Sequence, residues 1–226
     1  MRPSNSCLCK YTNPVQTKTR FIILMHPKEY RKEKIGTGRM TELQLENSEI
    51  IVGIDFTEHE RVNEILNDET ISPFLLYPGK VSFNLSVRGG ADTASFMGDQ
   101  PYLFLLDGTW SCARKMLKMS KNLQQLKRVS FDNKIVSKFR IKQQPQALCL
   151  STIETVYTVL NLLKKNEVEQ SDTEGFLKPF EKMIDHQVDC YLSPDNKNYY
   201  PAEREVDLKN VYHTKAKRSV IFEEER

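Results

Sequence analysis

The stretch that decides the fold reads Tyr102-Leu-Phe-Leu-Leu106-Asp107-Gly108-Thr109-Trp110-Ser-Cys112-Ala-Arg114-Lys115-Met116. Its first five residues form a short apolar run, which predicts a buried strand. From Cys112 to Leu126 apolar residues recur at steps of three or four, and this spacing predicts an amphipathic helix. The segment therefore reads as strand, turn and helix, the unit from which α/β proteins are built.

The same pattern extends outward along the chain. Further buried strands are predicted at Phe21 to Met25, Glu49 to Phe56, Pro73 to Tyr77 and Ala147 to Leu150. A short helix is expected over Glu60 to Asn67. Two more helices are expected after the capping boxes Ser151/Glu154 and Ser171/Glu174, over Val156 to Leu163 and Phe176 to Tyr191. The alternation predicts an α/β fold with a mostly parallel sheet and helices on both faces.

Composition narrows the class of protein. A chain of 226 residues fits one large α/β domain, which we place at residues 1–192, and the polar residues 193–226 read as an extension. No apolar run is long enough to span a membrane and Met1 to Lys10 lacks a signal-peptide core, so a soluble cytoplasmic protein is expected. The pair Cys7 and Cys9 lacks a second ligand pair, so no metal site is expected.

Charge is concentrated although the net charge is only +3. From Arg114 to Lys142 there are ten Lys or Arg residues and one acid, Asp132. A solvated helix face is one interpretation of this block, and contact with a nucleic acid backbone is the other, favoured for the block as a whole. No GxxxxGK[ST] motif occurs, which argues against an ATPase or a kinase.

Polar, Gly-rich or Pro-rich turns follow four of the predicted strands. They begin at His26, Tyr77, Asp107 and Ser151. Because ligands bind at the carboxyl ends of parallel strands, we expect one shared pocket. Asp107 is either a carboxylate whose pKa burial raises toward that of a useful base, or the N-cap of the next helix.

Other candidates also have two interpretations. Trp110, the only tryptophan, is either a core residue or a surface on which a base stacks. The segment from Gly36 to Arg39 reads as a flexible turn suited to an anionic group. His26 is more typical of a structural histidine, and Ser151 and Glu154 are already explained as a capping box.

Taken together, these residues resemble the DTW-domain family, which is named for its Asp-x-Thr-Trp element. The signature is Leu105 to Trp110 followed by Ala113 to Met116. Supporting matches occur in order, namely Arg2-Pro3, Cys7-x-Cys9, His26 to Glu29, Thr37 to Arg39, Leu75 to Pro78, Arg140 and Leu150 to Glu154. The resemblance covers about residues 1 to 165 and implies a SPOUT-like fold with a trefoil knot, which nothing in the periodicity indicates.

The resemblance also implies an activity. Members are tRNA-uridine aminocarboxypropyltransferases, in which N3 of a uridine attacks the γ-carbon of S-adenosylmethionine and methylthioadenosine leaves. The implied catalytic residues are Asp107, as base or as ligand of the cofactor's cationic groups, and Trp110. The implied cofactor contacts are Thr37, Gly38, Arg39, Leu76, Tyr77, Pro78, Gly108, Thr109, Leu150, Ser151, Thr152 and Glu154. The implied tRNA contacts are Arg114, Lys115, Lys118, Arg140 and Lys142.

Two alternatives remain at this stage. A SPOUT-type RNA methyltransferase would use the same cofactor with a different carbon facing the nucleophile. A noncatalytic RNA-binding protein would keep the basic block and be indifferent to loss of Asp107. The oligomeric state is not indicated by the sequence.

Overall fold

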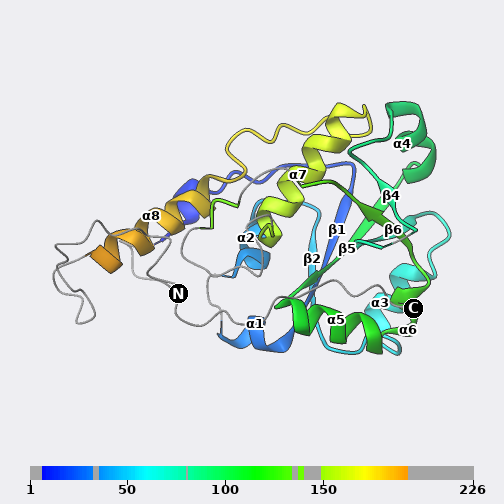
Figure 1. The fold of residues 1–226 in the computed structure, drawn as a ribbon, viewed down its shortest axis with the longest axis horizontal. Coiled ribbons are helices and arrows are strands. Elements are labelled where there is room, and N and C mark those ends of the chain that lie inside the picture. Colours follow the sequence, from blue (N-terminus) through cyan, green and yellow to red (C-terminus); the bar gives the residue numbers. More distant parts are fainter. Residues whose placement is uncertain (1–6, 33–35, 80, 134–136, 140–148, 193–226) are drawn as a thin grey trace.

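The protein is an α/β structure built on one parallel sheet (Figure 1). The computed structural model describes residues 7–32, 36–79, 81–133, 137–139 and 149–192. Within these ranges six strands lie in the order β2-β1-β5-β3-β6-β4, and neighbouring strands run parallel. Their bounds are β1 Arg20–Met25, β2 Glu49–Val52, β3 Ser72–Leu76, β4 Phe83–Asn84, β5 Pro101–Asp107 and β6 Lys127–Ser130.

Helices cover both faces of the sheet. One face packs against α2 (Thr37–Leu43), α4 (Gly90–Met97), α7 (Thr152–Lys165) and α8 (Lys178–Leu192). The other packs against α3 (Glu60–Leu66), α5 (Trp110–Met119) and α6 (Lys121–Gln124). The remaining helical elements are the 3-10 turn η2 (Cys9–Tyr11) and α1 (Pro27–Lys32). The predicted α/β architecture with two covered faces is therefore confirmed (Figure 1).

The core explains why the central strands have continuous apolar sequences. In β1, Phe21 and Ile23 pack into the cluster with α7 and α8, whereas Ile22 and Leu24 pack into the cluster with α3 and α5. All four side chains are fully buried. Burying each such side chain contributes about 1.5–3 kcal/mol to stability, so a strand buried on both faces needs an apolar residue at every position.

Three strand predictions are confirmed by β1, β3 and β5. The strand predicted over Glu49 to Phe56 ends at Val52, because the chain then turns Phe56 back into the core, where its backbone N–H donates to Ser120 Oγ over 3.0 Å. Of the strand predicted over Ala147 to Leu150, residues 147–148 lie outside the described residues, and residues 149–150 are in no strand. Strands β4 and β6 were not predicted.

The single helix predicted from Cys112 to Leu126 is wrong. The chain leaves helical geometry at Ser120, where ψ is 91°, and this separates α5 from α6. Ser120 is fully buried, and its hydroxyl donates to the Met116 carbonyl over 2.8 Å while accepting from Phe56. The helix predicted over Glu60 to Asn67 is confirmed as α3.

Of the two predicted capping boxes, only Ser151/Glu154 forms, at the start of α7. At Ser171/Glu174 the prediction is wrong, because α8 begins only at Lys178. Gly175 intervenes with φ of +75°, a left-handed conformation that interrupts a helix. The expected turn at Gly36 to Arg39 is likewise wrong, because Gly36 caps the helix α2 that starts at Thr37.

Two other expectations concern membrane-spanning segments and the C-terminal extension. No helix in the described part of the chain is long and apolar enough to cross a membrane. The polar extension over residues 193–226 lies outside the described residues.

Candidate active site

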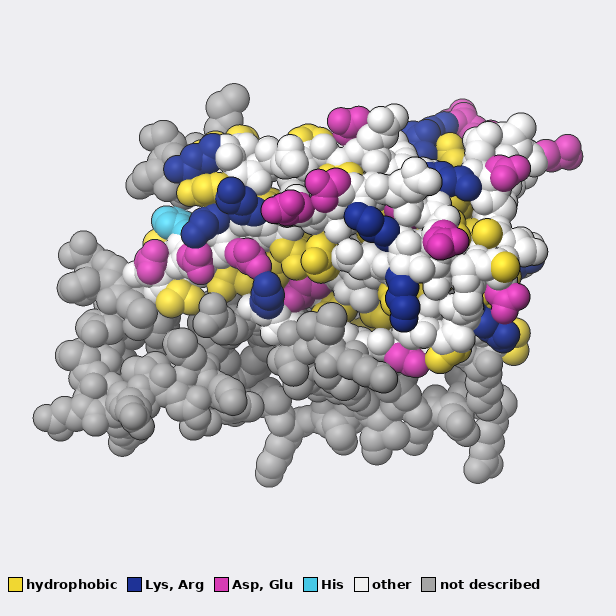
Figure 2. Space-filling view, turned by 90° about the horizontal axis from the view of Figure 1, so that it is seen from above, with side chains coloured by type: hydrophobic (Ala, Val, Ile, Leu, Met, Phe, Trp, Pro, Cys, Tyr) yellow, Lys and Arg dark blue, Asp and Glu magenta, His cyan; other side chains and the backbone are white. Residues whose placement is uncertain are grey.

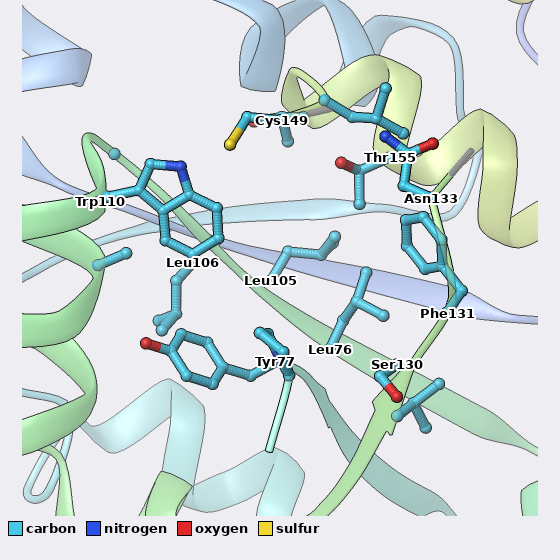
Figure 3. Close-up of a pocket in the computed structure, with 16 residues that line it drawn as sticks. Leu76, Tyr77, Leu105, Leu106, Trp110, Ser130, Phe131, Asn133, Cys149 and Thr155 are labelled. Atoms are coloured by element: carbon cyan, nitrogen blue, oxygen red, sulfur yellow. The ribbon is translucent and has the colours of Figure 1, made fainter. Parts of the chain in front are cut away.

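A cavity of about 440 Å³ lies at the carboxyl ends of three neighbouring strands, β5, β3 and β6 (Figure 3). The N-terminal turn of α7 and the first residue of α5 complete its wall. Its lining residues are Leu76, Tyr77, Pro78, Leu105, Leu106, Gly108, Trp110, Ala113, Val129, Ser130, Phe131, Asn133, Cys149, Leu150, Thr152 and Thr155. None of these described residues is an acid or a base. The cavity has the size and the apolar character typical of small-molecule sites.

The shared pocket predicted from the strand ends forms from three of the four turns. Tyr77 and Pro78 follow β3, Gly108 and Trp110 follow β5, and Thr152 begins α7. In Figure 3 the Trp110 indole and the Tyr77 ring lie on one side of the cavity and Thr155 and Phe131 on the other, with Cys149 beside the indole in this view. The turn at His26 is not part of the wall.

The predicted cofactor contacts divide into two groups. Leu76, Tyr77, Pro78, Gly108, Leu150 and Thr152 line the cavity, as does the predicted catalytic residue Trp110. The residues outside the wall are Thr37, Gly38, Arg39, Asp107, Thr109, Ser151 and Glu154. Most residues of the second group make contacts that hold the strand ends and helix starts around the cavity in place.

Asp107 is the last residue of β5 and is 7% exposed. It is not the helix N-cap, because Thr109 fills that position and its hydroxyl accepts from the Cys112 N–H over 3.3 Å. The Asp107 carboxylate instead accepts a hydrogen bond of 2.5 Å from the Thr152 hydroxyl. Asp107 is therefore linked to the cavity through a residue of the wall.

Helix α2 holds Asp107 from the other side. Gly38 packs so closely on the carboxylate that a Cβ there would lie 2.8 Å from the Asp107 Cγ. Any larger residue at position 38 would displace this side chain. The neighbouring Arg39 turns away, with its guanidinium 4.3 Å from the centre of the Tyr30 ring and an Nη donating to the Tyr30 carbonyl over 3.0 Å.

Glu154 has a connecting role. Its carboxylate closes the α7 capping box by accepting from the Ser151 N–H over 2.9 Å. It also accepts from the Ser137 hydroxyl and from the Lys138 N–H, each over 2.7 Å. Glu154 is 5% exposed and thus ties the segment 137–139 to the start of α7, beside the cavity.

His26 lies at the end of β1, next to Asp107. Its Nδ1 accepts from the Lys28 N–H over 3.1 Å, so this nitrogen carries no proton. Burial lowers the pKa of His26 below 6.5, and the positive charges of Lys28 and Lys115 add to the effect. His26 is thus a neutral, internally bonded histidine, as the structural interpretation predicted.

Nine wall residues were not predicted. They are Leu105, Leu106, Ala113, Val129, Ser130, Phe131, Asn133, Cys149 and Thr155. Four of them, Val129, Ser130, Phe131 and Asn133, were missed because β6 was read as part of the basic block, which hid the strand end at Ser130. The alternation of Val129 between two polar neighbours was the available signal.

The candidate tRNA contacts Arg114, Lys115 and Lys118 are all exposed on α5, directly beyond Trp110. Arg140 and Lys142 lie outside the described residues. A further cation, Arg128, lies over the Tyr77 ring at 5.7 Å from its centre. No ion pair among the described residues involves Arg114, Lys115, Lys118 or Arg128.

The side of the molecule over α7 and α8 differs in charge. Figure 2 shows acidic and basic side chains interspersed there rather than gathered by sign. Two ion pairs on α8 contribute, Lys138 with Glu181 at 2.7 Å and Lys182 with Asp185 at 3.1 Å. A polyanion would therefore find less uncompensated positive charge on this side than on α5.

The CxC pair lies apart from the cavity. A side-chain hydrogen bond with Cys7, in which Cys9 keeps its proton, raises the pKa of Cys9. Among the described residues no group of three or more His, Cys, Asp or Glu side chains could hold a metal ion.

Comparison with known proteins gives one family and several relatives. The family profile described as "DTW domain" matches residues 1–188. A protein of Mus musculus named "tRNA-uridine aminocarboxypropyltransferase 2" is 28% identical over 194 residues, which are 83% of this chain and 61% of that protein. Proteins of the same name from Macaca fascicularis and Drosophila melanogaster are 27% and 30% identical, over 61% and 73% of their lengths and 83% of this chain. The chain thus spans about 61% of the two mammalian relatives. No solved structure matches it.

Proposed function

The chain belongs to the DTW domain family, and from this premise we propose that it is a tRNA-uridine aminocarboxypropyltransferase with S-adenosylmethionine as donor. The observation that carries the proposal is the cavity at the ends of β5, β3 and β6, which two parts of the family signature, Gly108 and Trp110, help to line. The names of the relatives support the same reaction.

The wall fits an adenosyl sulfonium. Its apolar residues suit the adenosine, and the aromatic faces of Trp110 and Tyr77 attract a cation without adding a charge that would have to be desolvated. Gly108 keeps the turn after β5 free of a side chain, since a Cβ there would lie 3.2 Å from the Cys112 Cβ. The donor supplies a carbon already activated by the positive sulfur.

The residues of the chain contribute orientation. In the proposed reaction a bond forms between uridine N3 and the γ-carbon, the bond from that carbon to sulfur breaks, and its electron pair stays with sulfur. N3 also loses its proton, either to Asp107 through Thr152 or to water. The wall must therefore present the γ-carbon rather than the methyl group to N3. Asp107 acts through Thr152 in this proposal, either by accepting the proton or by stabilising a cationic part of the donor.

The tRNA is proposed to lie over α5. Arg114, Lys115 and Lys118 extend from the helix whose first residue is Trp110, so phosphates bound there would lie beside the cavity. The target uridine leaves its stack to reach the wall, where Trp110 offers a surface for it. Arg140 and Lys142 are included in the proposal by resemblance.

The same proposal takes residues 1–192 as the transferase domain and residues 193–226 as its extension. It also keeps the SPOUT-like trefoil knot that the resemblance implies. The parallel sheet, with β5 between β1 and β3, is compatible with it.

The test is direct. Purified protein is incubated with unmodified tRNA and S-adenosylmethionine, and the digested nucleosides are identified by mass spectrometry. Aminocarboxypropyluridine is expected from the wild type and is expected to be lost in Trp110→Ala, whose side chain lines the cavity. A methylated nucleoside would favour the methyltransferase, and tRNA binding without any product would favour the binding protein.

A further inference from the structure

Thr152 joins the cavity wall to Asp107, and the proton of its hydroxyl is already used in that contact. Thr152 lines the wall, and its Oγ1 donates to the Asp107 carboxylate over 2.5 Å. A threonine hydroxyl has one proton and two lone pairs. With the proton directed at Asp107, Thr152 offers a ligand only acceptor electron pairs.

Two elements hold the side chain of Asp107 in place. Its carboxylate lies at Thr152, the first residue of the 14-residue helix α7, and the N-terminus of a helix favours a negative charge. Gly38 and Met25 confine the carboxylate on its other side, where a Cβ at position 38 would lie 2.8 Å from both the Asp107 Cγ and the Met25 Cε. The carboxylate is therefore held one hydroxyl behind the wall.

We infer that Thr152 and Asp107 form the subsite for the primary ammonium group of the donor's amino acid portion. An ammonium N–H is a donor, as the Thr152 oxygen requires, and its positive charge matches Asp107. Since no described wall residue is charged, this pair is the wall's source of negative charge for such a group. The inference rests on the proposed function and assigns to Asp107 a positioning role, with Thr152 making the contact.

The alternative role of Asp107 as a base is less favourable on the same geometry. A proton from N3 would have to reach Asp107 by two transfers, one onto Thr152 and one from Thr152 onward. Recognition of a charge needs neither transfer.

Two ligands isolate the ammonium group. S-adenosylhomocysteine carries it, and the desamino analogue of S-adenosylhomocysteine keeps the carboxylate but lacks it. Their affinities for the full chain are measured by calorimetry, with the fluorescence of Trp110, the only tryptophan, as a second readout. Wild type should bind S-adenosylhomocysteine at least about tenfold more tightly, as expected of a hydrogen bond to a charged group.

Variants then show which side chains cause the preference for S-adenosylhomocysteine over its desamino analogue. Thr152→Val and Asp107→Asn should reduce it to about twofold or less, whereas Thr152→Ser, which keeps the hydroxyl, should retain it. Thr155→Val is the matched control, because Thr155 lines the same cavity from the same helix, whereas the hydroxyl bonded to Asp107 is that of Thr152. In this control any loss should be equal for both ligands.

The outcomes separate the two proposals. Equal affinities in the wild type, or a preference that survives in Thr152→Val, would overturn the subsite and leave the transferase proposal standing. A wild type that binds neither ligand would overturn the proposed function and the subsite with it. The preference is a ratio of two affinities measured on the same variant. A variant that is only less stable would therefore bind both ligands more weakly and keep the ratio.

Discussion

The ends of β1 and β5 are neighbours in the sheet, yet they use their polar residues differently. Met25 pairs with Asp107, and the His26 N–H donates to the Asp107 carbonyl over 2.8 Å. The His26 ring then bonds back to its own turn, at the Lys28 N–H. The Asp107 carboxylate instead reaches across to α7, where Thr152 forms part of the cavity wall.

The difference shows what makes a residue at a strand end a functional candidate. Both residues are buried and polar, and both follow an apolar run. His26 satisfies its hydrogen bond within three residues, so it stabilises a turn. Asp107 satisfies its bond 45 residues away, on an element that faces the ligand cavity. The location of the partner, rather than the type of residue, separates the two.

The largest expected effect comes from removing the two side chains in turn. Asp107→Ala should lower the rate of aminocarboxypropyl transfer by about 100-fold, equivalent to about 2.7 kcal/mol, because Thr152 loses its partner and the charge behind it. His26→Gln should stay within about threefold of wild type. Initial rates of the two variants are measured by mass spectrometry, and circular dichroism checks that both are folded. Equal losses in the two variants would remove the distinction.

The comparison extends to the basic helix that follows β5. Replacing Arg114, Lys115 and Lys118 together by Ala should weaken tRNA binding about tenfold and reduce the slope of log affinity against log salt by about 3. The control replaces Lys164, Lys165 and Lys178, three exposed cations of α7 and α8. tRNA affinity is measured across a salt series, and the affinity and salt slope of this control should stay near those of the wild type. An equal loss of tRNA affinity in the two triple variants would mean that α5 does not bind tRNA preferentially.

A smaller effect is expected at Gly38, which supports Asp107 but does not touch the cavity. Gly38→Ala should lower the transfer rate about tenfold and the Tm by about 4 °C, because its Cβ overpacks against the carboxylate. Gly89→Ala is the control, since a Cβ at that position meets nothing within 4 Å. The transfer rate and the Tm are measured for Gly38→Ala and for Gly89→Ala. An active, stable Gly38→Ala would show that Asp107 has more room than its contacts indicate.

The smallest effect concerns pH at the end of β1. His26 has a lowered pKa in the folded protein, so on unfolding it takes up a proton as the pH falls below 6.5. The wild type should therefore lose stability between pH 7 and pH 5, and His26→Gln should lose less, by about 2 °C in Tm. Thermal unfolding at the two pH values measures it. Identical losses would mean that His26 is not held neutral.

Much of this arrangement was predictable from local sequence. The apolar runs of β1, β3 and β5 predicted the centre of the sheet, because side chains buried on both faces leave no other pattern. The turns after β3 and β5 predicted part of the cavity wall. The Ser151/Glu154 capping box was also readable, since it depends on residues three apart.

The rest depends on contacts between distant segments. Strand β6 was hidden in the basic block because Lys127 and Arg128 extend over the rings of Phe96 and Tyr77, an environment that local sequence does not reveal. The break at Ser120 depends on Phe56, 64 residues away. That Asp107 faces Thr152 rather than capping α5 follows from the fold, because Thr109 is equally suited to cap the helix.

The most direct test of the account is a crystal structure of the full chain with S-adenosylhomocysteine. The account predicts the adenosine within the wall formed by Tyr77, Gly108 and Trp110, and the ammonium nitrogen within about 3 Å of Thr152 Oγ1. A ligand bound elsewhere on the molecule, or bound in this cavity with its ammonium directed away from Thr152, would contradict it.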